Sequence, residues 1–159
     1  MTEKVVSKTN KIIYFFVTTI FFIIFDFYFS NLILSTTINN FPTNPILDLV
    51  FVKNTGAAFS ILENFSLLLI TFSIIAILLV IAFVIKNVEK FSTFAFFWTS
   101  MLISGIYCNL YERIHFGYVR DFFKLNFIEF PIFNISDIFI NIGVIAIIII
   151  IIKNKYLKK

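Results

Sequence analysis

The most constraining feature of this sequence is a set of long apolar stretches without internal charges. Three of them cover residues 65–85, 91–112 and 138–152. They approach the roughly 20 residues that a helix needs to cross about 30 Å of hydrocarbon. Because the third stretch is short, we expect its helix to begin near residue 135, with Asp137 in its first turn. Only 14% of the residues are charged, which excludes an ordinary soluble domain.

A fourth apolar stretch covers about residues 12–34 and is interrupted only by Asp26. A basic N-terminus before an apolar run is also typical of a cleavable signal peptide. Here the run exceeds signal-peptide length, contains a carboxylate and is followed by no Ala-x-Ala-like site, so we interpret it as a retained helix. The sequence therefore predicts an α-helical integral membrane protein with a single domain over residues 1–159. Its four transmembrane helices are expected at roughly 12–34, 65–85, 91–112 and 135–152.

The positions of the lysines predict the direction of these helices. Nine lysines lie before the first span, between the second and third, or after the fourth. All nine fall on one side if the four helices alternate, and positive residues in short loops favour the cytoplasmic side. We therefore expect both termini in the cytoplasm and the segments 35–64 and 113–136 outside. The net charge of +4 follows from this topology and does not indicate a nucleic-acid partner.

The first outer segment contains a predicted strand and turn. Residues 46–53 are apolar and β-branched with two charged residues interspersed, a composition that favours a strand on the membrane surface. The sequence Asn54-Thr55-Gly56 that follows is small and polar, so the backbone can turn sharply or approach a ligand closely there. On its own, an Asn-x-Gly sequence marks a turn more often than a site.

The second outer segment brings polar residues into helical spacing. Asn109 and Arg113 are four residues apart and share a face if the third helix continues. Asn134 and Asp137 are three apart, which fits an Asn N-cap followed by an acidic residue in the first turn of the fourth helix. Helix capping alone would explain why Asn134 and Asp137 occur at these positions. An ion pair with a neighbouring cation would explain the presence of Asp121. Ionisable groups at membrane depth are rare, however, and usually face a polar cavity or a partner.

Three motifs occur in order on the predicted outer side. They are VKNTGAAF at 52–59, NLYER at 109–113 with GYVRDF at 117–122, and FNISD at 133–137. Together they resemble the lipoprotein signal peptidases, the type II signal peptidases of bacteria, which are membrane-embedded aspartic proteases. Each motif alone would be weak evidence, but their order relative to four spans covers nearly the whole chain and is specific.

The resemblance implies an intramembrane aspartic endopeptidase whose catalytic pair is Asp121 and Asp137. It also implies a set of residues that bind substrate or organise the site: Asn54, Gly56, Asn109, Glu112, Arg113 and Asn134. The implied substrate is a prolipoprotein with a diacylglyceryl-modified cysteine, cut just before that cysteine. The resemblance further implies a small extracytoplasmic β-sheet cradle and an active site near the outer leaflet of the bacterial cytoplasmic membrane. It implies contact with membrane lipid but no metal, cofactor or obligate protein partner.

Several positions depart from the usual family residues. The departures are at Cys108 (glycine in the family), Glu112 (aspartate), Arg120 (a small aliphatic residue) and Ser136 (alanine). Of an Asp-Gln-x-x-Lys pattern in the first helix, only Asp26 remains. We expect Glu112 to act through the neighbouring Arg113. An Arg120 side chain that turns inward would favour an ionised Asp121, whereas one that turns outward would contact lipid headgroups.

Two close carboxylates suit peptide hydrolysis because they share one proton, which leaves one as a base toward water and the other as an acid toward the carbonyl. Two other classes fit the composition. A proton-coupled transporter would use Asp26, Asp121 and Asp137 as a relay, but a relay needs polar groups through the midplane, and inverted repeats are not evident. A structural subunit would tolerate replacement of the aspartates. Cys108 and His115 are too few for a zinc site and lie about two helical turns apart, too far for a nucleophilic pair.

Overall fold

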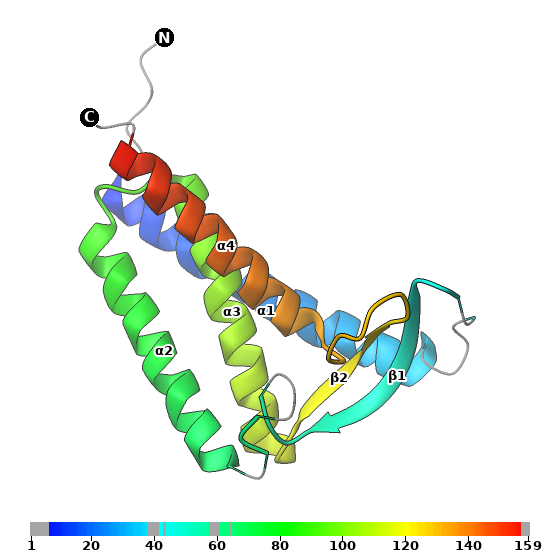
Figure 1. The fold of residues 1–159 in the computed structure, drawn as a ribbon. Helices are drawn as coiled ribbons and strands as arrows, with labels where there is room; N and C mark the ends of the chain where they lie inside the picture. The colour runs from blue at the N-terminus through cyan, green and yellow to red at the C-terminus, as the bar shows by residue number, and fades with distance from the viewer. Residues whose placement is uncertain (1–6, 38–41, 43, 58–60, 64, 157–159) are drawn as a thin grey trace.

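The computed structural model describes residues 7–37, 42, 44–57, 61–63 and 65–156. Four helices dominate it: α1 (Lys8–Leu32), α2 (Ser66–Asn87), α3 (Thr93–Phe116) and α4 (Ile135–Tyr156). A short π-helical segment, η1 (Ile33–Thr37), continues α1. The four helices are long and apolar enough to cross a membrane, and they overlap all four predicted spans (Figure 1). The prediction of a four-helix membrane protein is therefore confirmed.

Helix α3 lies at the centre of the bundle. It packs against α1, α2 and α4, whereas α2 packs mainly against α3 (Figure 1). Glycines make the contact between α3 and α4 close: a Cβ on Gly105 would lie 2.5 Å from the Ser136 carbonyl oxygen, and one on Gly143 would lie 3.0 Å from Leu102 Cα. Because a larger side chain at either position would push the helices apart, these glycines set the distance between α3 and α4.

Hydroxyl groups join α3 to α1 inside the bundle. Ser100 Oγ lies 2.7 Å from Thr18 Oγ1 and 3.1 Å from the Phe15 carbonyl oxygen. Ser104 Oγ donates to the Thr19 carbonyl oxygen at 3.0 Å. Serine is small enough to let the two helices approach, and these bonds satisfy its hydroxyl where no water is available. The hydroxyl contacts therefore fix α1 against the central helix.

We expect Ser104→Leu to destabilise the protein by about 1–3 kcal/mol, because the larger side chain has no room in the contact between α1 and α3. Ser104→Ala should cost only about 0.6 kcal/mol, which is typical of one hydrogen bond between membrane helices. Thermal unfolding in detergent micelles measures both. Thr71→Leu on the exposed surface of α2 is the matched control, and an equal loss there would contradict a specific contact at Ser104.

Helix α3 extends one turn beyond the predicted end of its span. The sequence predicts an end at Glu112, but α3 continues to Phe116. Gly117 stops the helix with a φ of 79°, a left-handed conformation that glycine adopts at little cost, and its N–H donates to the Arg113 carbonyl oxygen at 3.1 Å. The extra turn keeps Arg113 on the helix, one turn from Asn109, as their spacing predicts.

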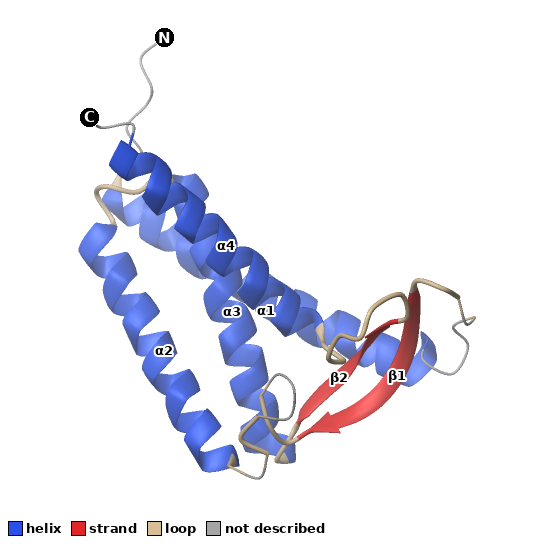
Figure 2. Cartoon of the chain, in the orientation of Figure 1, coloured by secondary structure: helices blue, strands red, loops and turns tan. Residues whose placement is uncertain are grey.

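Two antiparallel strands, β1 (Leu47–Asn54) and β2 (Val119–Leu125), lie beside one end of the bundle (Figure 2). Their register places Val52 opposite Asp121. Side chains two residues apart along a strand share a face, so Asn54 and Asp121 are diagonal neighbours on the same face of the sheet. The predicted strand at 46–53 and the predicted small sheet are confirmed. The register then explains how Asn54 reaches Asp121.

Candidate active site

Two asparagine side chains connect the two aspartates of the predicted catalytic pair. Asn134 Nδ2 donates to Asp121 Oδ1 at 2.9 Å and to Asn109 Oδ1 at 3.1 Å. Asn109 Nδ2 in turn donates to Asp137 Oδ1 at 2.8 Å. Asp121 belongs to β2, Asn109 to α3, and Asn134 and Asp137 to the start of α4. Three elements therefore meet at this point, and two amides hold the carboxylates in a fixed relation.

The start of α4 has the capping geometry that the spacing of Asn134 and Asp137 predicts. Asn134 Oδ1 accepts from the Asp137 backbone N–H at 2.9 Å, and Asp137 Oδ2 accepts from the Asn134 backbone N–H at 3.1 Å. This reciprocal pair satisfies two backbone donors at the helix N-terminus. Capping and the link to Asp121 use different atoms of Asn134, so one side chain performs both roles.

A second set of contacts reaches Asp121 from the sheet. Asn54 Nδ2 donates to Asp121 Oδ2 at 2.8 Å, and Asn54 Oδ1 accepts from the Gly56 N–H at 2.9 Å. The Gly56 carbonyl oxygen accepts from Arg113 Nη2 at 2.9 Å, and Arg113 Nη1 lies 3.4 Å from the Asn109 carbonyl oxygen. All the predicted site residues except Glu112 thus join one hydrogen-bonded network.

Burial and charge together raise the pKa of Asp121. The residue is only 1% exposed. Burial disfavours the ionised carboxylate, and the negative charge of Asp137 acts in the same direction, so the pKa rises to about 7. The amide donors of Asn54 and Asn134 and the positive charge of Arg113 oppose this rise without cancelling it. Below about pH 7, Asp121 therefore carries a proton.

The departures at Glu112 and Arg120 pair with each other. Arg120 Nη2 and Nε lie 2.6 and 2.8 Å from Glu112 Oε1, and the Arg120 backbone N–H donates to Glu112 Oε2 at 2.7 Å. Arg120 Nη1 also donates to Asn31 Oδ1 at 3.0 Å. The direct contacts of Glu112 are thus with Arg120, and the expectation that Glu112 acts through Arg113 stays a prediction. The expectation that Arg120 turns toward Asp121 is wrong, because alternation along β2 turns it away from Asp121 and toward Glu112. Contact of Arg120 with lipid headgroups stays a prediction.

We expect Glu112→Gln to lower stability by about 3 kcal/mol, since it leaves the largely buried Arg120 guanidinium without its carboxylate. Adding Arg120→Leu should restore part of the loss, and the two changes should couple by about 0.5–3 kcal/mol. Thermal unfolding of both single variants and the double variant measures this coupling. Glu89→Gln, which removes the exposed partner of Lys8, is the control and should change little. Additive effects at Glu112 and Arg120 would contradict a direct pair.

A third carboxylate contacts the start of α4 from α1. Asp26 is 2% exposed, and its Oδ2 accepts from Ser136 Oγ at 2.6 Å. Both residues stand out in the sequence, but no spacing rule predicts a contact between positions 110 residues apart. What the sequence does indicate is that a carboxylate inside a membrane span, such as Asp26, requires a polar partner within the protein. The departure at Ser136 supplies that partner.

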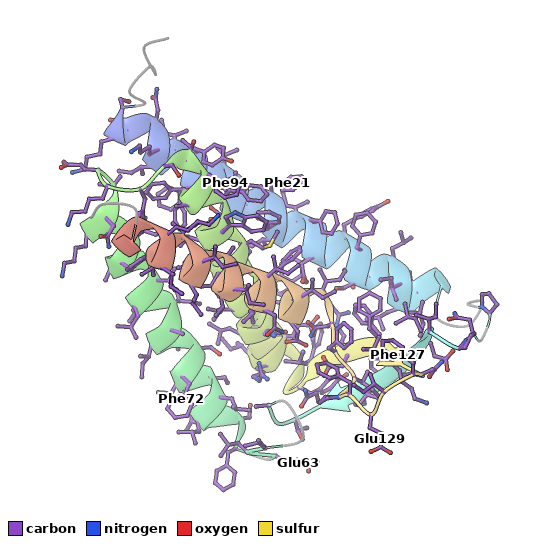
Figure 3. All side chains as sticks on the ribbon, turned by 45° about the horizontal axis from the view of Figure 1, so that its top comes forward. Phe21, Glu63, Phe72, Phe94, Phe127 and Glu129 are labelled. Carbon is purple, nitrogen blue, oxygen red and sulfur yellow. The ribbon has the colours of Figure 1, made fainter. Side chains whose placement is uncertain are left out.

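An open groove of about 850 Å³ runs beside Asp121. Its walls come mainly from β1, the turn after it and the segment that follows β2. Phe127, Ile128 and Phe130 of that segment expose apolar side chains, and Figure 3 shows Phe127 and Glu129 on this side of the molecule. A polypeptide lying in the groove would pass directly beside the Asp121 carboxyl group and its hydrogen-bonded network.

Comparison with known proteins agrees with the geometry of this site. Residues 18–153 match the family model described as Signal peptidase (SPase) II. The lipoprotein signal peptidase of Streptococcus thermophilus strain CNRZ 1066 is 33% identical over 126 residues, which cover 79% of this chain and 80% of the relative. That of Caldicellulosiruptor bescii is 40% identical over 108 residues, which cover 68% of this chain and 69% of the relative. The chain belongs to the signal peptidase II family.

Solved structures agree with membership of the signal peptidase II family. One is a bacterial membrane enzyme determined by the in meso method at 2.3 Å resolution. It matches with a TM-score of 0.79 and 32% identity, and the match covers 91% of both chains. A second bacterial membrane enzyme, at 1.9 Å resolution, gives a TM-score of 0.71 and 31% identity over 87% of this chain and 92% of the other. The resemblance stated from the sequence motifs is therefore confirmed.

Proposed function

We propose that this member of the signal peptidase II family removes the signal peptide from diacylglyceryl-modified prolipoproteins, with Asp121 and Asp137 as its catalytic pair. Cleavage falls just before the lipidated cysteine. Family membership supports the activity and its aspartic class. The observation that carries the assignment of the pair is the bridge through Asn134 and Asn109. This bridge holds two carboxylates from β2 and α4 in one network, beside an open groove.

The two carboxylates divide the proton transfers of peptide hydrolysis. Burial and mutual repulsion make the pair share one proton in the resting enzyme, and they raise the pKa of Asp121 to about 7. Amide groups contact both carboxylates: Asn54 and Asn134 donate to Asp121, and Asn109 donates to Asp137. Asp137 removes a proton from the attacking water, and Asp121 protonates the carbonyl oxygen of the scissile bond. The tetrahedral intermediate collapses when Asp137 passes the proton taken from water to the amine nitrogen, Asp121 regains a proton from a hydroxyl of the intermediate, and the C–N bond breaks.

The groove suits a peptide that is partly embedded in lipid. The exposed apolar side chains after β2 can contact the apolar part of a signal peptide, while the polar groups around Asp121 contact the scissile bond. The bound peptide excludes water from the groove, and polar contacts are stronger where water is excluded. This division of the groove supports a lipid-modified peptide as substrate, whose acyl chains remain in the membrane.

We propose further that the chain acts as one membrane-embedded domain of the bacterial cytoplasmic membrane, with both termini in the cytoplasm and the active site near the outer leaflet. The lysine distribution supports this orientation. Lysines at and before the start of α1, at or just after the end of α2, and at or after the end of α4 fall on one side if the helices alternate. The sheet that carries Asp121 lies at the other end of the bundle (Figure 1).

Asp121→Asn and Asp137→Asn should each abolish cleavage of a diacylated prolipoprotein. Asparagine keeps the shape of the side chain but neither accepts nor usefully donates the catalytic proton. The double variant should be hardly worse than either single variant, because members of one catalytic unit have strongly non-additive effects. Release of signal peptide per mole of folded enzyme, from a lipidated substrate and from a non-lipidated control, measures both activity and substrate class.

Glu129→Gln is the matched control for these variants, because Glu129 is a second carboxylate on the groove and belongs to no contact of the network. It should retain most of the activity. If Asp137 only capped α4, Asp137→Asn would lower the folded fraction and leave the activity per folded molecule unchanged. That outcome would contradict the catalytic assignment.

The raised pKa of Asp121 predicts the alkaline limb of the pH profile. As the pH rises through about 7 the carboxyl loses its proton, so the pair can no longer supply an acid and kcat/KM should fall. Asn54→Ala removes a donor that stabilises the ionised form, so the pKa should rise and the limb should move to higher pH. Asn126→Ala is the control, because this amide of the same groove donates to the Asn44 carbonyl oxygen. A limb that stays in place in Asn54→Ala would argue against a proton on Asp121.

A further inference from the structure

A second cavity, of about 570 Å³, lies at the end of the bundle away from the sheet. It is bounded by the turn before α3, the first turns of α3 and the C-terminal half of α4. Figure 3 shows Phe94, one of its lining residues, far from Phe127 and Glu129 beside the groove. The cavity therefore belongs neither to the candidate active site nor to the groove.

Two lysines from different segments line this cavity. Lys90 lies two residues before Ser92, the N-cap of α3, and Lys153 lies near the end of α4. Within the described part of the chain neither lysine forms an ion pair, and the neighbouring Glu89 pairs with Lys8 at 3.9 Å instead. Two uncompensated positive charges on one cavity favour an anion between them. The polar end of the cavity therefore suits a negatively charged group.

The remaining wall is apolar and has room for a hydrocarbon chain. Ala146 is the only small side chain between residues 144 and 152, where every other residue is valine or isoleucine. It lines the cavity together with Ile149 of α4 and with Phe94 and Trp98 of α3. The indole N–H of Trp98 is buried without a hydrogen-bond partner among the described residues, which is rare for a buried donor. Apolar and cationic surfaces thus adjoin in one cavity.

We propose that this cavity binds an anionic phospholipid, with the phosphodiester between Lys90 and Lys153 and the first part of an acyl chain along Ala146. Basic pockets between transmembrane helices bind anionic headgroups, and tryptophan is enriched at the membrane interface. A soluble anion would leave the apolar wall uncovered. The N-terminal part of a signal peptide is positively charged, so the two lysines repel it. The bound lipid joins α3 to α4 at the end opposite the sheet.

Native mass spectrometry of the full chain in detergent tests this proposal. Phosphatidylglycerol and phosphatidylcholine with identical acyl chains are offered at equal concentrations, and we expect preferential retention of phosphatidylglycerol. Lys90→Gln combined with Lys153→Gln should weaken its binding about fivefold for each lysine, which corresponds to about 1 kcal/mol per charge. Ala146→Leu should also weaken binding with both charges intact, because it fills the space for the acyl chain.

Two matched variants should leave lipid binding unchanged. Lys86→Gln removes a lysine at the same end of the bundle that does not line the cavity, and Val144→Leu enlarges an exposed residue of α4. Thermal unfolding without added lipid shows that each variant is folded. Equal retention of the two lipids, unchanged binding in the double lysine variant, or displacement of phosphatidylglycerol by an equal concentration of glycerol 3-phosphate would each overturn the proposal.

Discussion

Both candidate catalytic carboxylates depend on the amide group of Asn134. Its oxygen accepts the Asp137 backbone N–H, and its nitrogen donates to Asp121 and to Asn109. A primary amide has two N–H donors and one acceptor oxygen, so each of these groups has a partner. An aspartate in this place would lack both donors and would add a third negative charge. One side chain therefore sets the positions of β2, α3 and the start of α4 relative to one another.

The position of each helix in the bundle explains its composition. The central α3 is the least apolar of the four membrane helices, and α2, which meets mainly α3, is the most apolar. Polar groups at membrane depth need partners inside the protein, and a central helix has neighbours on most of its faces. Ser100 and Ser104 use α1, whereas Asn109 uses α4. A helix that faces mostly lipid has no such partners to offer.

Contacts within one turn were predictable from the sequence, whereas contacts between separate elements were not. The spacing of Asn134 and Asp137 predicts their cap because both residues lie at the same helix start. The pair Glu112 and Arg120 follows from no spacing rule, since Gly117 ends the helix between them and strand pairing decides which way Arg120 points. The buried carboxylate of α1 likewise meets its hydroxyl partner 110 residues away. Family motifs, and not helical spacing, linked the aspartates of β2 and α4.

The short connection between α3 and β2 makes the number of residues there as important as their type. Only Gly117 and Tyr118 separate the two elements. Because side chains alternate along a strand, one inserted residue would move Arg120 into the place of Asp121 and turn the carboxylate to the opposite face. A guanidinium would then meet the amide donors of Asn134, with no acceptor for either group. A substitution at Tyr118 therefore leaves Asp121 in its place, whereas a change in the length of this connection would remove a candidate catalytic residue without mutating it.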